Sequence, residues 1–379
     1  MTNAEMRRIY WSFAIVPFLI GGAVVPVQAQ TAPPQSQASP DPTRREIQPD
    51  LRVDRDPVAS PDAATPVAPA TTAAGRPLEK SGNNIYTLHE NVDEVLLACT
   101  LIDDKGRTVT DLGAQNFRVW EDGVPQTITS FERRDVPVSM GILVDDSGSM
   151  RYKRPAVQTA ALDLVRESNP RDAEFIVNFN DRAFLDQGFT SNLSALERGL
   201  ARYDARGTTA IYDAVAASAD ELSKNAAWPK QVLLIITDGD DNASHLNLAQ
   251  TVERVQALGG PVVYAIGLLY DAESPGEASH ARDALETLAD DTGGVAFFPN
   301  SIDEVDQIAR EVALDIRNQY TVGYHSTRPA TQGGYRTVRV EAQAAGHGHL
   351  IVRTRHGYYP QQVRQMHTGV NESAADTQH

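Results

Sequence analysis

One stretch of the sequence constrains both the fold and the chemistry of this chain: an apolar run that ends abruptly in an aspartate. The run is Val138–Val144, and Asp145 follows it directly. Ser147 and Ser149 flank a glycine just beyond. Such a run is typical of a parallel strand buried on both faces, and open α/β sheets bind ligands where these strands end. One carboxylate and two hydroxyls at alternate positions suit a hard cation such as Mg²⁺, so we expect part of a metal site here.

Strand-like runs alternate with helical stretches from Pro137 to Arg317. The expected strands are Val138–Val144, Glu174–Phe179, Ala183–Phe189 (a short edge strand), Gln231–Ile236, Val262–Gly267 and Val295–Phe298. The expected helices are Pro155–Glu167, Asn192–Tyr203, Ala210–Leu222, Leu246–Leu258, His280–Ala289 and Ser301–Ile316. Repeated βα units of this length predict a mostly parallel sheet with helices on both faces.

Both flanks of this α/β region carry strand signals without helices between them. The expected strands are Val92–Ile102, Phe117–Trp120 and Gln126–Phe131 before it, and Tyr320–Tyr324, Tyr335–Glu341 and Leu350–Arg355 after it. Each flank alone is too small to close a sandwich comfortably. We therefore expect the two flanks to pack together into one small β-sandwich, with the α/β domain inserted between its halves.

The two ends of the chain differ in composition from the middle. Residues 1–29 have the pattern of a secretory signal peptide: Arg7 and Arg8 precede an apolar run, and Val27-Gln28-Ala29 offers a cleavage site. An uncleaved anchor helix is the alternative, because the run approaches the length that spans a bilayer. Residues 30–83 are rich in proline and alanine and are predicted to be a disordered linker. The polar tail, 361–379, is expected to be flexible.

These observations predict six segments. They are a signal peptide (1–29), a linker (30–83), the N-terminal part of the β-sandwich (84–136), the α/β domain (137–317), the C-terminal part of the β-sandwich (318–360) and a tail (361–379).

The net charge of −16 disfavours a nucleic-acid partner and an anionic membrane surface, since both need a basic protein face. The single cysteine, Cys99, cannot form an internal disulfide and lies in an apolar run, so we expect it in a core. We expect a secreted, periplasmic or cell-surface location, with no integral membrane segment after signal cleavage.

Two further stretches belong with the first. The segment Arg206–Ala214 is a glycine-containing loop that leads into a helix, so a threonine hydroxyl in it can reach the same edge of the sheet as Asp145. The run Leu233–Ile236 leads into Thr237 and Asp238, and is thus a second buried strand that ends in a carboxylate. Two neighbouring strands that each end in aspartate place like charges side by side, which is unfavourable unless a cation lies between them.

Taken together, Asp-x-Ser-x-Ser, a Gly-x-Thr loop and Thr-Asp-Gly after an apolar strand resemble the von Willebrand factor type A domain. In that family these residues form the metal-ion-dependent adhesion site. The resemblance covers Pro137 to about Arg317 and implies a doubly wound, mostly parallel, Rossmann-like sheet. The flanking Gly106-Arg107, Phe117–Gly123 and Tyr320–Tyr324 resemble the surroundings of this domain in a secreted bacterial branch of the family.

The resemblance also assigns metal ligands. The implied ligands of Mg²⁺ or Mn²⁺ are Asp145, Ser147, Ser149, Thr209 and Asp238, the last directly or through water. Thr208 is the alternative to Thr209, but Thr209 stands three positions before Tyr212, as in the family's Gly-x-Thr-x-x-Tyr-Asp-Ala pattern. Such a ligand set leaves the shell of an octahedral ion incomplete, so water or a partner's carboxylate completes it. We therefore expect an adhesion or binding protein whose partner is a protein ligand presenting a carboxylate.

Other readings of the same residues remain open. An aspartate after a buried strand can accept a phosphoryl group, but Ser147 stands where that chemistry places a second aspartate. No Gly-x-Ser-x-Gly elbow surrounds Ser147 or Ser149. We therefore expect no enzyme, no catalytic residue and no organic cofactor. A structural cell-envelope component with a fold-stabilising metal site is the main alternative, and a metal-dependent hydrolase is the weaker one. Asp213 is expected to stabilise the start of its own helix, and Asp240 and Asp241 to form a solvated loop.

Overall fold

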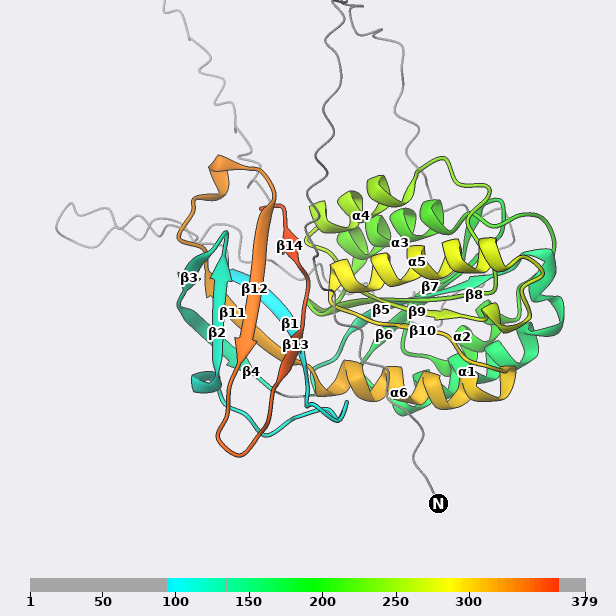
Figure 1. Ribbon diagram of the computed structural model, residues 1–379. Helices are drawn as coiled ribbons and strands as arrows, with labels where there is room; N and C mark the ends of the chain where they lie inside the picture. Colours follow the sequence, from blue (N-terminus) through cyan, green and yellow to red (C-terminus); the bar gives the residue numbers. More distant parts are fainter. Residues whose placement is uncertain (1–93, 134, 361–379) are drawn as a thin grey trace, which may run out of the picture. The chain divides into compact units, whose positions relative to one another are not determined.

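The computed structural model describes residues 94–133 and 135–360. These residues form one six-stranded sheet with helices on both faces and two four-stranded antiparallel sheets (Figure 1). The predicted signal peptide, linker and tail lie outside the described residues. No helix within the described ranges is long and apolar enough to cross a membrane.

The six-stranded sheet has the strand order β10-β9-β8-β5-β6-β7. Its strands are β5 (Ser139–Asp145), β6 (Ala173–Phe179), β7 (Ala183–Thr190), β8 (Gln231–Thr237), β9 (Val262–Gly267) and β10 (Ala296–Phe297). Neighbouring strands pair in parallel except β6 and β7, which pair antiparallel. The predicted doubly wound, mostly parallel sheet is therefore confirmed, with β7 at its edge.

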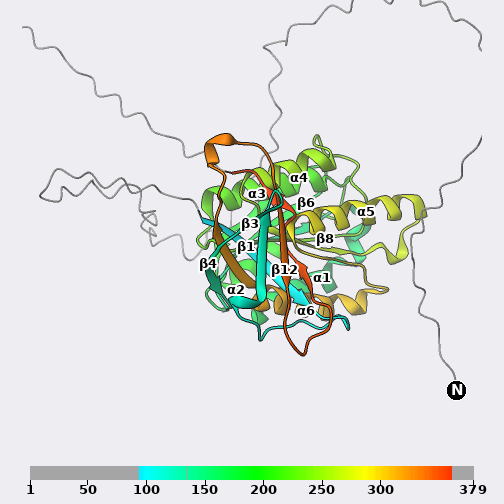
Figure 2. The ribbon, with the colours of Figure 1, turned by 60° about the vertical axis from the view of Figure 1, so that its left-hand side comes forward.

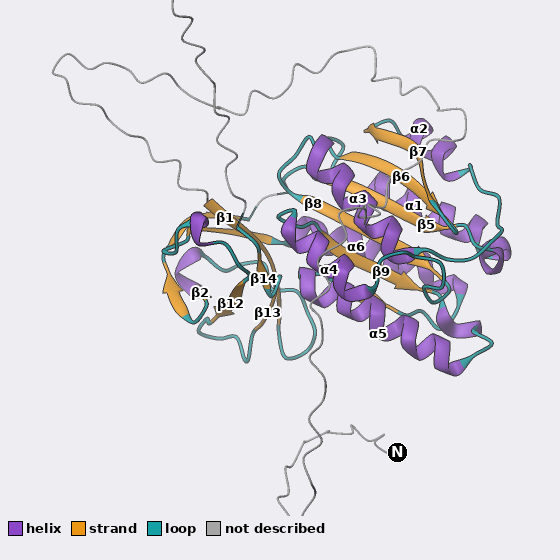
Figure 3. Cartoon of the chain, turned by 90° about the horizontal axis from the view of Figure 1, so that it is seen from above, coloured by secondary structure: helices purple, strands orange, loops and turns teal. Residues whose placement is uncertain are grey.

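Six helices cover the two faces of this sheet. They are α1 (Arg154–Glu167), α2 (Leu193–Leu200), α3 (Ile211–Asn225), α4 (Leu248–Ala257), α5 (Pro275–Thr292) and α6 (Val305–Asn318). Helices α3, α4 and α5 lie on one face, and α1, α2 and α6 on the other (Figure 1 and Figure 2). Figure 3 looks down on the face that α3, α4 and α5 cover.

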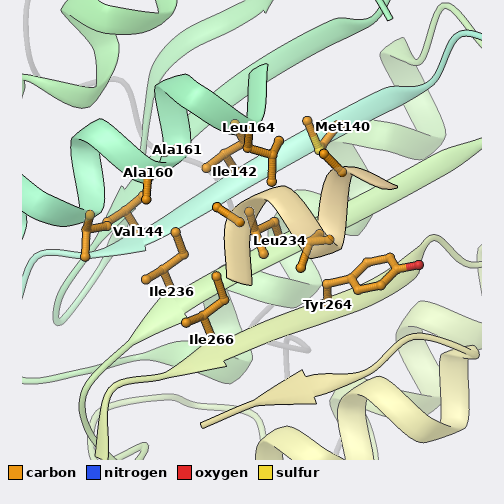
Figure 4. Close-up of a cluster of buried hydrophobic side chains, with 14 of the residues drawn as sticks. Met140, Ile142, Val144, Ala160, Ala161, Leu164, Leu234, Ile236, Tyr264 and Ile266 are labelled. Carbon is orange, nitrogen blue, oxygen red and sulfur yellow. The ribbon is translucent and has the colours of Figure 1, made fainter. Parts of the chain in front are cut away.

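The side chains of β5 point alternately to the two faces of the sheet, which explains why helices cover both faces. Successive side chains of a strand point to opposite faces, so an all-apolar strand needs a packing partner on each side. Ile142 and Val144 pack with Leu164 of α1 in one buried cluster (Figure 4). Leu143 belongs to a second cluster on the other face, together with Val215 of α3. Every residue of β5 is buried, which places its last residue, Asp145, at the centre of the sheet edge.

Helix α5 is longer than its sequence pattern predicted. The prediction was His280–Ala289, whereas the helix spans Pro275–Thr292. Its start is set by Ser274, whose side chain accepts a hydrogen bond from the backbone N–H of Glu277. Its end is set by Gly293, which has a φ of +87° that favours glycine. The apolar spacing is limited to the middle of the helix, and the two caps extend it beyond that spacing.

The two antiparallel sheets each combine strands from before and after the α/β domain. One has the order β13-β1-β11-β4 and the other β14-β12-β2-β3. The strands are β1 (Glu94–Ile102), β2 (Phe117–Glu121), β3 (Val124–Gln126), β4 (Ile128–Glu132), β11 (Tyr320–His325), β12 (Arg336–Ala342), β13 (Ile351–Arg353) and β14 (Gly357–Tyr358). Leu97 and Val322 of the first sheet share a buried core with Val119 and Val338 of the second. This is the sandwich architecture expected from the flanks, and Cys99 is buried in it.

Two of the predicted flank strands are wrong in detail. The expected strand Gln126–Phe131 is two strands, β3 and β4, which belong to different sheets. The break falls at Thr127, where the chain passes from one sheet to the other, and the side chain of Gln126 donates to the backbone oxygen of Val124. The expected strand Leu350–Arg355 is shorter, and a separate β14 follows it.

Candidate metal centre

The first loop begins at Asp145, the last residue of β5, which is fully buried. Its Oδ1 accepts a hydrogen bond from the backbone N–H of Ser147 at 2.7 Å. Its Oδ2 accepts one from the hydroxyl of Thr237, at the end of the neighbouring strand β8, at 2.6 Å. The Asp145 side chain is therefore held between the first loop and the end of β8.

The two serines connect the first loop to the third. The hydroxyl oxygens of Ser147 and Ser149 lie 3.1 Å apart. The hydroxyl of Ser149 donates to Oδ1 of Asp238 at 2.7 Å, although 89 positions separate them in the sequence. The carboxyl ends of the parallel strands β5 and β8 bring these residues together, as the sequence predicted.

The second loop contributes Thr209, which is 4% exposed, whereas Thr208 is exposed to solvent. The hydroxyl oxygen of Thr209 lies 3.8 Å from the position that a Cβ on Gly239 would occupy, so it is next to the third loop. The side chain of Asn242 accepts a hydrogen bond from the backbone N–H of Thr209 at 2.9 Å. The structure therefore brings all five predicted side chains to one edge of the sheet and favours Thr209 over Thr208.

Burial and a neighbouring negative charge both raise the pKa of Asp145. Desolvation raises the pKa of Asp145 to about 6, and the charge of Asp238 adds to that rise. The hydrogen bonds from Thr237 and Ser147 oppose the rise because they stabilise the ionised carboxylate. Two carboxylates thus lie close together at this edge, as expected from the two strands that end in aspartate.

A lysine that the sequence analysis missed lies beside Asp238. The ammonium of Lys153 donates to Oδ2 of Asp238 at 2.8 Å and to Oδ1 of Asp271 at 2.6 Å. Hydrogen bonds to these two aspartates raise the pKa of Lys153 against the opposing effect of its burial. No sequence signal identified this contact, because Lys153 does not directly follow an apolar strand, and its partners Asp238 and Asp271 are 85 and 118 positions away.

Two further side chains that the analysis missed hold the first loop in place. The buried carboxylate of Asp146 accepts hydrogen bonds from the backbone N–H groups of Asp204 and Ala205, and Ala205 has a φ of +47°. The buried guanidinium of Arg154 donates to the backbone oxygen of Asp145 and to the side chain of Asn178 at 2.7 Å. The Asp-Asp pair was visible in the sequence as a possible signal, but nothing in the sequence marks Arg154 as buried.

The acidic residues near the third loop make contacts beyond their expected roles. Asp213 lies in the first turn of α3, as expected, and also accepts hydrogen bonds from the backbone N–H groups of His245 and Leu246. Asp241, expected in a solvated loop, accepts one from the backbone N–H of Tyr212 and so caps the start of α3. The carboxylate of Asp240 is 2.6 Å from Nδ1 of His280. These contacts join the third loop to the start of α3 and to α5.

The donor set fits a hard divalent cation. It consists of two carboxylates, from Asp145 and Asp238, and three hydroxyls, and Mg²⁺ and Mn²⁺ prefer oxygen ligands. Within residues 94–133 and 135–360, no three His, Cys, Asp or Glu side chains gather into a group that could hold a metal. The fit therefore depends on the hydroxyl groups of the two serines and the threonine.

A comparison with protein families agrees with the geometry. Residues 140–240, which run from β5 to just beyond β8, match the family model described as von Willebrand factor type A domain. This chain contains a von Willebrand factor type A domain. Domains of this family commonly bind divalent cations, and they bind protein ligands. The sequence matches none of the curated proteins with which it was compared.

The solved structures to which this chain is similar include a mussel protein and bacterial proteins. Proximal thread matrix protein 1 from the mussel byssus is 17% identical, with a TM-score of 0.39 over 51% of this chain and 49% of that chain. A von Willebrand factor type A protein from Catenulispora acidiphila is 14% identical, with a TM-score of 0.40 over 72% and 74%. The pilus adhesin SpaC from Lactobacillus rhamnosus GG, in an open conformation, is 12% identical, with a TM-score of 0.40 over 66% and 48%. This chain thus spans about half the length of the mussel protein and of the adhesin.

Proposed function

We propose that this protein is an exported binding protein that engages an acidic group of a protein partner through a divalent cation. The cation, Mg²⁺ or Mn²⁺, is held by Asp145, Ser147, Ser149, Thr209 and Asp238. The observation that carries the proposal is the meeting of these side chains from three loops, with the Ser149 hydroxyl 2.7 Å from Asp238. Export rests on the signal-like pattern of residues 1–29.

Coordination chemistry supports a binding role. Mg²⁺ takes six oxygen ligands in a near-octahedral shell. Hydroxyls are neutral donors, so two carboxylates leave the ion electron-poor and receptive to a carboxylate from a partner. Domains of this fold are typical of non-enzymatic adhesion proteins. A bound cation also relieves the repulsion between Asp145 and Asp238.

The first test is metal-dependent stability. Millimolar Mg²⁺ should raise the melting temperature of the purified protein, because a ligand present at about 100 times its Kd stabilises the folded state by about 2.7 kcal/mol. Asp145→Ala should abolish the increment. Glu253→Ala, which removes an exposed carboxylate on α4, is the matched control and should keep it. An unchanged melting curve with and without chelator contradicts the metal site.

The second test is metal-dependent partner capture. Immobilised protein should retain a partner from a cell-surface extract in Mg²⁺, lose it in EDTA and recover it when Mg²⁺ is restored. Asp145→Ala should capture nothing, and Glu253→Ala should behave as the unmodified protein. If Mg²⁺ stabilises the protein but no partner depends on it, the fold-stabilising role replaces the adhesive one. Hydrolysis of phosphate or ester substrates that is lost in Asp145→Ala would instead establish an enzyme.

A further inference from the structure

Lys153 brings a fixed positive charge to the candidate metal centre. It lies between the first loop and α1, and its side chain is 11% exposed. Its ammonium bridges Oδ2 of Asp238, at 2.8 Å, and Oδ1 of Asp271, at 2.6 Å. The ring of Tyr270 lies beneath the ammonium, 5.4 Å from it. A lysine this well enclosed, with two carboxylate partners, has a defined position in the site.

Both carboxylate oxygens of Asp238 are already in use. Oδ1 accepts from the hydroxyl of Ser149, and Oδ2 accepts from the ammonium of Lys153. These two donors differ in how they respond to a cation. The Ser149 hydroxyl can turn and offer its oxygen to the ion, whereas an ammonium has no lone pair and is repelled by it. A divalent ion at Asp238 therefore opposes the Lys153 ammonium and not the serine.

Asp271 gives the ammonium another partner. It is the last residue of the short 3₁₀ helix Leu269–Asp271, which follows β9, and its side chain is 50% exposed. The lysine side chain is a flexible four-carbon stem, so its ammonium can leave one carboxylate while it keeps the other. The lysine can thus withdraw from Asp238 without becoming an unpaired buried charge.

We propose that Lys153 competes with the divalent ion for Asp238, that Asp271 holds the ammonium when the ion binds, and that this pair sets the metal affinity of the site. The inference rests on the proposed metal site and adds the residues that tune it. The site then loads only where the free ion is abundant enough to displace an internal cation. It also stays more electron-poor when loaded, because a positive charge remains nearby, and this favours an anionic partner.

The first experiment measures the affinity of the purified full chain for the metal alone. Mg²⁺ is titrated calorimetrically, and Mn²⁺ is titrated by the electron paramagnetic resonance signal of the free ion. Lys153→Met should bind either ion about tenfold more tightly, because it removes a positive charge next to the site. Lys153→Gln, which keeps a hydrogen-bond donor without the charge, should shift the affinity in the same direction. Arg151→Met, which removes an exposed charge two positions away, is the control and should change the affinity little.

The second experiment tests the role of Asp271 by a double-mutant cycle. Asp271→Asn should weaken metal binding about tenfold when Lys153 is present, because the ammonium then has Asp238 as its remaining carboxylate partner. In the Lys153→Met background the same substitution should have a much smaller effect. A simple loss of negative charge near the ion would weaken binding equally in both backgrounds, and that result would overturn the role given to Asp271.

The outcomes separate this inference from the proposed function. If the unmodified protein binds metal and both Lys153 variants bind it equally or less tightly, Lys153 orients Asp238 instead of competing for it, and the inference fails while the metal site stands. If neither the unmodified protein nor any variant binds Mg²⁺ or Mn²⁺, both fail. Melting curves in EDTA establish that each variant is folded, and Lys153→Gln carries the test if Lys153→Met is not.

Discussion

Glu121 in the β-sandwich and Asp145 in the α/β domain are both buried carboxylates, 2% and 0% exposed. Glu121 has a cation built in beside it: a guanidinium nitrogen of Arg336 lies 3.3 Å from its Oε1. The hydroxyls of Tyr324 and Tyr358 donate to its Oε2 at 2.7 Å and 2.8 Å. Within the sandwich, therefore, the protein itself supplies the positive charge and the hydrogen bonds that this carboxylate needs.

Asp145 is surrounded differently. It accepts hydrogen bonds from Ser147 and Thr237, but the neighbouring charge that shifts its pKa is the negative charge of Asp238, which raises it. Of the two cations at this edge, Lys153 pairs with Asp238, and Arg154 donates to the backbone oxygen of Asp145. The difference shows what distinguishes a structural carboxylate from one suited to an ion from solution. The first is neutralised by its own fold, and the second faces another carboxylate across a loop edge.

The largest loss of stability should follow from removing the guanidinium of Arg336 beside Glu121. Arg336→Met leaves a buried carboxylate with hydroxyl donors and no paired charge, and such changes typically lower the free energy of unfolding by about 4 kcal/mol. Urea denaturation measures it. Arg339→Met, on the exposed side of the same strand, is the control and should change stability by about 0.5 kcal/mol or less. The Mg²⁺ response of Arg336→Met should be intact if the two regions are independent; a lost response would show that the sandwich supports the metal centre.

Glu174 in β6 is a third buried acidic side chain, and it should make the stability of the folded protein depend on pH. Burial raises its pKa to about 8, from the usual 4.5, and the charge of Asp172 adds to the rise. Between these two values the folded protein keeps a proton that the unfolded chain releases. The protonated Glu174 therefore contributes its full stabilisation to the folded state below about pH 4.5. This contribution is lost as the pH rises through about 8.

Glu174→Gln should remove that pH dependence. The unmodified protein should lose about 3 kcal/mol of stability between pH 5 and pH 8 through this group, and the variant should not. At pH 8 the variant should be the more stable protein, and at pH 5 the two should be similar. Urea denaturation at the two pH values, in EDTA, provides the measurement. Equal slopes with pH in the two proteins would show that Glu174 is ionised at neutral pH and has found other donors.

The sequence carried enough information to predict the sheet and the edge where the candidate site lies. Buried parallel strands such as Val138–Val144 are long apolar runs, and their carboxyl ends meet at one edge, so residues after two such runs are close in space. The sequence therefore predicts that Asp145 and Asp238 lie close together. The role of the five side chains as metal ligands stays a prediction.

Contacts between residues that do not directly follow two buried strands were beyond the reach of sequence patterns. Lys153 reads as the polar start of a helix, and its partner Asp238 is 85 positions away. The same limit hid the split at Thr127, because residues on either side of it continue a strand-like pattern although they enter different sheets. Apolar periodicity reports burial of one element at a time, whereas ion pairs and sheet crossings depend on which elements become neighbours.

The smallest change in stability should come from Asp145→Asn in the absence of metal. The amide keeps the shape of the carboxylate and an acceptor for the Ser147 N–H, and it removes the repulsion from Asp238. Stability in EDTA should therefore rise, by about 1 kcal/mol or less, as measured by urea denaturation. Glu121→Gln is the matched comparison and should be destabilising, because it leaves Arg336 without its buried counter-charge. If Asp145→Asn instead lowers stability as much as Glu121→Gln does, Asp145 is a structural carboxylate, and the contrast between the two regions disappears.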